Sequence, residues 1–209
     1  MNAYIHPTAL IEEGVQIGAD SSVWDGVHIR RNTHIGHHCI IGEKSHISYD
    51  VQIGNLVKIN AFVYICSAVT LEDGVMVSTG CIFTNDRYPR ATEPELMSLR
   101  SSAPDERTMP TVVRAGATLG AGSLIGCNLT IGRFAMVGMG SLVTRPIDDF
   151  HMALGHPARV VGYVCRCGLP FAKFLADHHP ERIVHSCAVC RRRYTTRNGV
   201  VTESFAALS

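Results

Sequence analysis

The chain has 209 residues, of which 46% are hydrophobic and 18% are charged, and its formal net charge is +1. This composition supports a folded core and excludes a chain that is disordered throughout. The near-neutral charge gives no general attraction to nucleic acid or to an anionic membrane, so we expect neither as a partner. The sequence starts without a basic and apolar leader and has no apolar run of about 18 residues, which indicates a cytoplasmic protein.

A six-residue repeat begins close to the N-terminus. From Ile5 to Phe83, every sixth residue is a large apolar one, without exception over fourteen positions. The same phase returns from Val113 to Val143. A small or β-branched residue, such as Ala9, follows four positions after most of these residues, and a glycine often follows directly. This pattern is a hexapeptide repeat.

A period of six matches neither the 3.6-residue helical turn nor the two-residue alternation of a strand. It fits short strands joined by corners, in which three hexads form one triangular coil and the apolar residue points into the prism. The hexads make roughly seven coils, stacked at about the 4.8 Å spacing of neighbouring strands. The sequence therefore predicts an all-β fold: a left-handed parallel β-helix over residues 1–162, and a separate tail over residues 163–209.

Residues 86–112 interrupt the repeat. The segment contains four prolines and no hexad period, so we expect a long loop inserted into the β-helix. The chain enters it from Phe83 to Arg90 with FTNDRYPR, which combines an amide, a carboxylate, two guanidinium groups and a phenol. That mixture suits a polar ligand, although a solvated loop without a ligand has a similar composition.

One column of residues also departs from an ordinary repeat. Positions 18 apart lie on the same face of successive coils, which aligns His28, His46, Tyr64 and Ile82. These side chains precede inward residues and therefore face outward. Stacked imidazole and phenol groups are typical of an interface or a binding cleft, and the alternative is a hydrated surface ladder.

The tail contains two closely spaced pairs of cysteines, 19 residues apart. The four cysteines are Cys165, Cys167, Cys187 and Cys190. In a cytoplasmic chain, paired cysteines indicate a metal before a disulfide, and four thiolates with no open position are typical of structural zinc. Three nearby histidines are alternative ligands: His178, His179 and His185. The run Arg191–Arg193 is interpreted as a solvated face or part of an acidic interface rather than a nucleic-acid contact.

Three segments of the chain resemble a known family. They are VWDGVHIRRNTHIGHHCIIGE from Val23, VKINAFVYICSAVTLEDGVMVSTGCIFTNDRYPRA from Val57, and GHPARVVGYVCRCG from Gly155. Over about residues 5–165 the chain resembles the sugar N-acyltransferases of the hexapeptide β-helix superfamily. The nearest members acylate an amino group on a nucleotide-linked sugar, such as UDP-linked 3-amino-glucuronic acid or dTDP-linked 3-amino-6-deoxyhexoses. Hexads identify only the fold, whereas FTNDRYPRA followed by a loop and GHPAR is more specific.

The resemblance implies a homotrimer whose active sites lie in grooves between two β-helices. It implies acetyl-CoA as cosubstrate, with its thin arm along later coils where side chains are small and Arg159 near its phosphates. Asn85, in the TN motif, would hold the sugar amine beside the thioester, and positioning would supply much of the rate. The candidate residues are His28, His46 and Asp86 as bases, Tyr64, Asp86, Arg87 and Arg90 for the sugar, and Ala121, Gly122, Met139 and Gly140 for CoA.

The chain departs from this family at two places. Cys66 and Ser67 stand where relatives commonly have an aromatic and an acidic residue, and the stretch 61–64 is bulkier than in many relatives. The sugar pocket is therefore expected to be reshaped.

Two other functions are compatible with a β-helix. A γ-class carbonic anhydrase needs three histidines around a zinc ion, two of them in a close downstream pair, and the coils have no histidine after His46 until His151. A non-catalytic scaffold subunit is the second alternative, because solenoids also serve as assembly surfaces. The polar loop motif argues against it.

Overall fold

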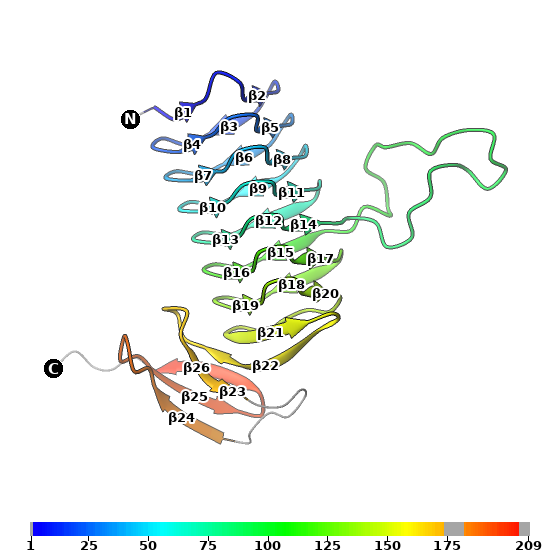
Figure 1. Cartoon of the computed structure of the whole chain (residues 1–209). Helices are drawn as coiled ribbons and strands as arrows, with labels where there is room; N and C mark the ends of the chain where they lie inside the picture. Colours follow the sequence, from blue (N-terminus) through cyan, green and yellow to red (C-terminus); the bar gives the residue numbers. More distant parts are fainter. Residues whose placement is uncertain (1, 174–181, 205–209) are drawn as a thin grey trace.

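The computed structural model describes residues 2–173 and 182–204. Figure 1 shows a stack of coils, a long loop leaving one side, and a small sheet beyond the last coil. The described residues form 26 β-strands and no helix. Consequently, this part of the chain has no helix that is long and apolar enough to cross a membrane.

Three sheets form the faces of the prism. The first contains β1 (Tyr4–Ile5), β4 (Ser22–Val23), β7 (Ile40–Ile41), β10 (Lys58–Ile59), β13 (Met76–Val77), β16 (Thr118–Leu119), β19 (Met136–Val137) and β21 (His151–Gly155), and continues antiparallel through β22 (Ala158–Val164) and β23 (Pro170–Lys173). The second contains β2 (Leu10–Ile11), β5 (His28–Ile29), β8 (His46–Ile47), β11 (Tyr64–Ile65), β14 (Ile82–Phe83), β17 (Leu124–Ile125) and β20 (Leu142–Val143). The third contains β3 (Gln16–Ile17), β6 (His34–Ile35), β9 (Gln52–Ile53), β12 (Val69–Leu71), β15 (Thr111–Val113) and β18 (Leu129–Ile131).

The apolar hexad residues fill the prism, as the repeat predicts. Ile29, Ile47 and Ile65 are 0% exposed, whereas Ile5 on the first coil is 43% exposed because only one neighbouring coil covers it. Before the inserted loop, partners in the parallel ladders are 18 positions apart, as in the pairing of Ile29 with Ile47. The left-handed parallel β-helix predicted from the repeat is confirmed.

The small hexad residues form hydrogen bonds between coils. Ser21, Thr33 and Ser45 are buried, and each hydroxyl donates to a carbonyl oxygen 15 positions later, at 2.9, 2.8 and 3.0 Å. The glycines after the apolar positions are needed for space: a Cβ on Gly36 would lie 2.6 Å from the carbonyl oxygen of Gly54. The corners therefore satisfy buried backbone groups while the coils stay close together.

The inserted loop leaves the β-helix after β14 and returns at β15. It ends two residues earlier than expected, because Thr111 already pairs with Val69 in the third sheet. Before the loop, Lys58 pairs with Met76, 18 positions away; across it, Met76 pairs with Thr118, 42 positions away. The insertion therefore adds 24 residues without shifting the register of the ladders.

The tail packs against the last coil. Strands β24 (Arg182–Ser186), β25 (Arg193–Arg197) and β26 (Val200–Ser204) form an antiparallel sheet, while β22 continues through the expected domain boundary at residue 162. The ring of Phe150 lies 5.5 Å from the rings of both Phe134 and Tyr194. The guanidinium group of Arg166 lies 4.4 Å from the centre of the Phe134 ring. This second apolar cluster joins the tail to the β-helix.

Candidate functional site

The base of the inserted loop stands on a column of three residues: Tyr49, Ser67 and Asn85, spaced by 18 positions. Asn85 Nδ2 donates a hydrogen bond to Ser67 Oγ at 2.9 Å, and the Asn85 carbonyl accepts one from the Met109 amide at 2.8 Å. Ser67 is buried, with 4% of its surface exposed. The side chain of Asn85 is thus fixed by the coil beneath it, and its backbone by the returning end of the loop.

A polar cavity of about 250 Å³ lies between this column and the loop. Asn85, Asp86 and Arg90 line it from the outgoing part of the loop, and residues 100–103 line it from the returning part. Three of the predicted site residues therefore meet in one place. Arg87 is exposed and does not line the cavity.

Tyr49 anchors the returning part of the loop to the β-helix. Its hydroxyl donates to the carbonyl oxygen of Ser102 at 2.9 Å. The guanidinium groups of Arg30 and Arg31 lie 5.2 and 5.0 Å from the centre of its ring. These cation–π contacts hold the phenol in place beneath the loop.

The predicted histidine column exists on the outer face of the second sheet. The rings of His28 and His46 meet edge to face at 4.9 Å, and Tyr64 stacks on His46 at 5.3 Å. Burial and the neighbouring charges of His28 and Arg30 lower the pKa of His46, so its neutral form is favoured at neutral pH. None of the three rings lines the cavity that contains Asn85.

Glu12 organises the first end of this column. Its Oε1 lies 2.9 Å from His28 Nε2 and 3.1 Å from Arg30 Nε, and its Oε2 accepts a hydrogen bond from the Arg31 amide at 3.0 Å. The pKa of Glu12 is lowered from the ordinary 4.5 to about 2. The hydrogen bond from the Arg31 amide is the largest cause, and the hydrogen bonds with His28 and Arg30 also lower it. The carboxylate is therefore the persistent form in the folded protein.

Acidification between about pH 4.5 and 2 should remove the stabilisation that Glu12 provides. Because its pKa is lower in the folded state, this contribution is present above pH 4.5 and is lost as the pH falls through 2. In a series of thermal melts across this range, Glu12→Gln should flatten the fall of Tm with pH. Glu13→Gln, which changes an exposed neighbour, should leave the slope as in the wild type; equal slopes for all three proteins would contradict the assignment.

The residues predicted for CoA lie at one corner of the later coils. The Gly140 amide donates to the Ala121 carbonyl at 2.9 Å, which places the two turns directly above each other. A Cβ on Gly122 or Gly140 would have no atom within 4 Å, so this corner is open on its outer side. Met139 is 82% exposed beside it. The two glycines thus leave a narrow strip of open backbone beside Met139, which a thin acyl chain can follow.

Arg159 belongs to the hairpin of β21 and β22 beyond these coils, where it pairs with Leu154. Its Nη1 donates a hydrogen bond to the carbonyl of the preceding Ala158 at 2.9 Å. Gly155, in the same hairpin, donates to Ser141 Oγ at 3.2 Å, which ties the hairpin to the coil that carries Gly140.

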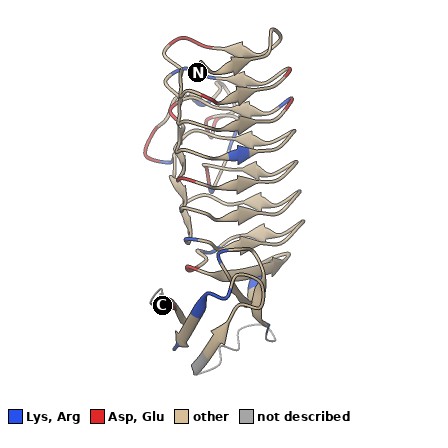
Figure 2. Ribbon diagram, turned by 90° about the vertical axis from the view of Figure 1, so that its left-hand side faces the viewer, with Lys and Arg blue, Asp and Glu red and all other residues tan. Residues whose placement is uncertain are grey.

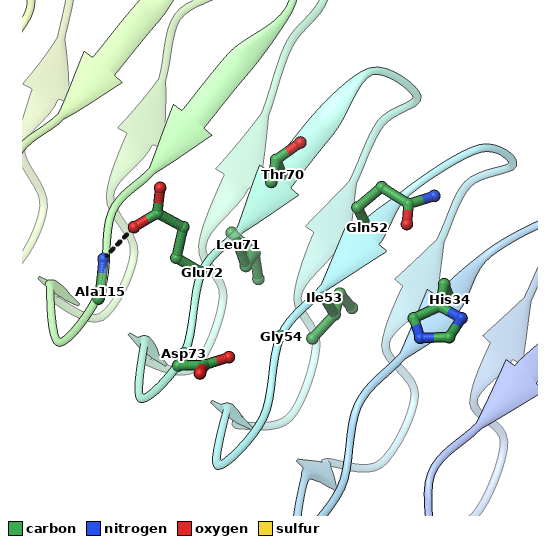
Figure 3. A pocket seen from close by; sticks show the side chains of 9 residues that line it. All are labelled: His34, Gln52, Ile53, Gly54, Thr70, Leu71, Glu72, Asp73 and Ala115. Carbon is green, nitrogen blue, oxygen red and sulfur yellow. Dashed lines mark hydrogen bonds between the residues drawn. The ribbon is translucent and has the colours of Figure 1, made fainter.

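A second depression, of about 460 Å³, lies on the outer face of the third sheet. Figure 3 shows Gln52 and His34 projecting from neighbouring strands, and Glu72 turned toward the backbone of Ala115. Glu72 Oε2 accepts a hydrogen bond from the Ala115 amide at 2.9 Å, and Asp73 Oδ1 caps the backbone one coil away. Both carboxylates therefore serve the corner of the fold.

The four tail cysteines converge, as their spacing predicts. Their sulfur atoms all lie within 4.8 Å of one another. Cys165 Sγ lies 3.2 Å from Cys190 Sγ, and Cys167 Sγ lies 3.5 Å from Cys187 Sγ. A tetrahedral zinc ion with bonds of about 2.3 Å separates its sulfur ligands by about 3.8 Å, a value that lies between the shortest of these distances and the 4.8 Å limit. All eight cysteines of the chain are free of disulfides.

The surroundings of the cluster affect its thiols differently: burial raises the pKa of Cys165 to about 12, whereas the thiolate of Cys190 is favoured. The hydrogen bond from the Arg192 amide is the largest cause of the lowered pKa of Cys190, which is about 6. Tyr194 Oη lies 3.1 Å from Cys165 Sγ and accepts a hydrogen bond from the Arg166 amide at 3.1 Å. Such outer contacts orient metal ligands.

The other predicted features of the tail have different roles. His185 stacks on Phe171 at 4.9 Å, and among the described residues the only group of three or more converging ligands is the set of four cysteines. His178 and His179 lie outside the described residues. Figure 2 shows basic residues on the tail strands, and in the Arg191–Arg193 run Arg192 pairs with Glu203 at 3.0 Å.

Comparison with known proteins agrees with the geometry of the coils. The family described as the hexapeptide repeat of succinyl-transferase matches residues 9–36. The matched residues lie within the six-residue repeat that forms the coils. The chain is 41% identical, over 93 residues, to a dTDP-3-amino-3,6-dideoxy-α-D-galactopyranose 3-N-acetyltransferase of Aneurinibacillus thermoaerophilus, a match that covers 44% of each chain.

Two further similarities involve acyltransferases. A serine acetyltransferase of Escherichia coli K12 is 44% identical over 50 residues, which is 24% of this chain and 18% of the relative. The chain spans less than half the length of these two curated relatives. Among solved structures, the N-acyltransferase AntD of Bacillus cereus shares the fold with a TM-score of 0.55 and 20% identity, covering 79% of this chain and 82% of AntD.

Sequence reasoning missed two residues of the site. Ser67, interpreted only as a departure from relatives, is the hydrogen-bond partner of Asn85, and Tyr49 anchors the loop. The 18-residue spacing of Tyr49, Ser67 and Asn85 is a signal that was present in the sequence. Arg100, which also lines the cavity, has no such signal, because the loop has no period.

Proposed function

We propose that this protein is a CoA-dependent N-acyltransferase that transfers acetyl from acetyl-CoA to the amino group of a nucleotide-linked amino deoxy sugar. The observation that carries the proposal is Asn85, an amide fixed by Ser67 at the edge of a polar cavity. The similarity to a sugar 3-N-acetyltransferase supports the same reaction class.

The proposed chemistry needs little beyond positioning. With Nδ2 held by Ser67, the Oδ1 atom of Asn85 accepts a hydrogen bond from the sugar amine. The amine nitrogen attacks the thioester carbonyl, the C–S bond breaks, and the CoA thiolate leaves while the nitrogen loses a proton. Of the candidate bases, Asp86 is the one that lines the cavity with Asn85, which favours it over His28 and His46.

In this proposal, acetyl-CoA lies along the open corner formed by Ala121, Gly122, Met139 and Gly140, and Arg159 contacts its phosphates. The open space beside the backbone of Gly122 and Gly140 supports this placement. Because CoA thioesters are intracellular metabolites, the same proposal places the protein in the cytoplasm.

The reaction is tested by incubating the full chain with acetyl-CoA and a panel of nucleotide-linked amino sugars. We expect release of free CoA thiol and an acetyl mass gain on at least one sugar. Matched nucleotide sugars with a hydroxyl in place of the amine serve as the control and should gain nothing. If no amino sugar is acetylated, or if the hydroxy sugars react equally, the proposed function is wrong.

The protein is further proposed to be a homotrimer. The outer face of the second sheet carries the His28–His46–Tyr64 column together with the half-exposed Leu10 and Ile82, a surface suited to contact with another β-helix. Light scattering should therefore give three times the chain mass. A monomer mass at micromolar concentration would contradict the assembly.

We also propose that Cys165, Cys167, Cys187 and Cys190 bind one structural zinc ion. Four sulfur ligands leave no coordination position for a substrate, and the cluster lies in the tail rather than at the cavity beside Asn85. When bound, the ion would cross-link β22 and the following turn to the hairpin between β24 and β25. The zinc would thus stabilise the tail without taking part in acyl transfer.

A further inference from the structure

Arg100, on the returning part of the inserted loop, lines the cavity although no sequence motif indicates it. The Nε atom of Arg100 is buried and has no hydrogen-bond acceptor within the described residues. The nearest carboxylate oxygen, Oε2 of Glu93, lies 3.7 Å away, which makes an ion pair that is too long for a hydrogen bond. The long ion pair compensates the charge of Arg100 only in part, and an anion in the cavity that Arg100 lines would pair with the other nitrogens of its guanidinium group.

Arg100 is held at the cavity by the β-helix. Ser102, two residues later, accepts the hydrogen bond from the Tyr49 hydroxyl, and the Arg100 amide donates to the Ala91 carbonyl at 3.0 Å on the opposite part of the loop. Tyr49 stands on the same column as Ser67 and Asn85. The guanidinium group is therefore positioned relative to Asn85 by the coil register and by pairing within the loop.

Some of the charged side chains that line the cavity already have partners within the protein. Arg107 pairs with Asp105 at 3.3 Å, and Asp86 Oδ1 accepts a hydrogen bond from the Tyr88 amide at 2.7 Å. The lining thus holds three arginines and three carboxylates, and Arg90 and Arg100 are its guanidinium groups with no carboxylate oxygen within hydrogen-bond distance among the described residues. A guanidinium group binds the paired oxygens of a phosphate or carboxylate with two parallel hydrogen bonds.

We propose that Arg100, assisted by Arg90, binds an anionic oxygen group of the acceptor substrate in this cavity. The inference rests on the proposed function and adds to it the class of group that is recognised beside the amine. Two parts of a nucleotide sugar carry this chemistry: the diphosphate and a carboxylate on the sugar ring. Arg100 is thus a substrate-binding residue that determines which nucleotide sugars are accepted.

The test compares the wild type with Arg100→Gln and Arg100→Lys, and uses Arg145→Gln on an exposed turn of the β-helix as the matched control. Calorimetric titration with UDP, dTDP, UDP-glucose and UDP-glucuronic acid separates the two sources. If the diphosphate is bound, Arg100→Gln weakens binding of all four probes by about 10- to 100-fold. If a carboxylate is bound, the variant loses only the preference of the wild type for UDP-glucuronic acid over UDP-glucose.

Arg100→Lys keeps the charge but loses the paired donors, so it should recover only part of the binding. Unchanged affinities in Arg100→Gln, equal weakening in Arg145→Gln, or no binding of any probe to the wild type would overturn the inference. Failure of the acyltransferase proposal is distinguishable: it appears as absent acetyl transfer by the wild type, whereas failure of this inference appears as transfer with the same KM for the sugar in Arg100→Gln.

Discussion

Replacing Asn85 with Ala should lower the rate of acyl transfer by about 100-fold or more at saturating acetyl-CoA. The substitution removes the Oδ1 atom that is proposed to orient the amine, while no atom of the apolar core is lost. The oligomeric state and the zinc content should stay as in the wild type. The measurement is the single-turnover rate with an amino sugar that the wild type acetylates.

Ser67→Ala provides a graded comparison. It leaves the amide of Asn85 in place but removes the hydroxyl that accepts its hydrogen bond at 2.9 Å, so the amide can rotate. We expect a smaller loss of rate than for Asn85→Ala. A wild-type rate for Asn85→Ala would mean that the reactive site lies elsewhere on the coils.

Replacing Cys187 with Ser should abolish the bound zinc and unfold the tail. A structural zinc ion contributes about 10–16 kcal/mol of apparent binding free energy in zinc-finger peptides, so loss of one of four ligands removes a large part of the stability of such a small unit. Metal analysis should fall from one zinc per chain to none, and limited proteolysis should cut the tail while the β-helix resists. A strong chelator should have the same effect on the wild type.

Cys81→Ser is the matched control for this change. Cys81 is buried in the β-helix at a small-residue position of the hexad, where Ser21, Ser45 and Ser123 occupy equivalent places. Its Sγ lies 3.1 Å from the Gly120 carbonyl, which a hydroxyl can also reach. Zinc content and tail protection should not change. Retention of zinc by Cys187→Ser would refute the assignment of the ligands.

The fold was predictable because one physical requirement recurs along the chain. Every sixth side chain must fill the same prism, and every residue after it must tolerate the close approach of the next coil, as at Gly36. The spacing of the tail cysteines was similarly informative, because ligands for one ion must converge. By contrast, β22 connects the two parts of the chain by pairing antiparallel to β21, a contact that follows no period.

Only the wall of the cavity that belongs to the β-helix could be predicted from the sequence. The column of Tyr49, Ser67 and Asn85 follows from the 18-residue coil, so the floor of the cavity is implicit in the repeat. The opposite wall depends on how the loop folds back, through contacts such as that of Tyr49 with Ser102. Those contacts join residues 53 positions apart that share no pattern, and only the structure brings Arg100 to Asn85.

The insertion of 24 residues between β14 and β15 leaves the ladders in register on both sides. The scaffold and the loop can therefore change independently during evolution. A loop from a relative could be grafted between Asn85 and Thr111 without altering any core contact, and a new acceptor specificity could arise by exchanging a single segment. For protein engineering, this fold offers a rigid frame with one interchangeable recognition element.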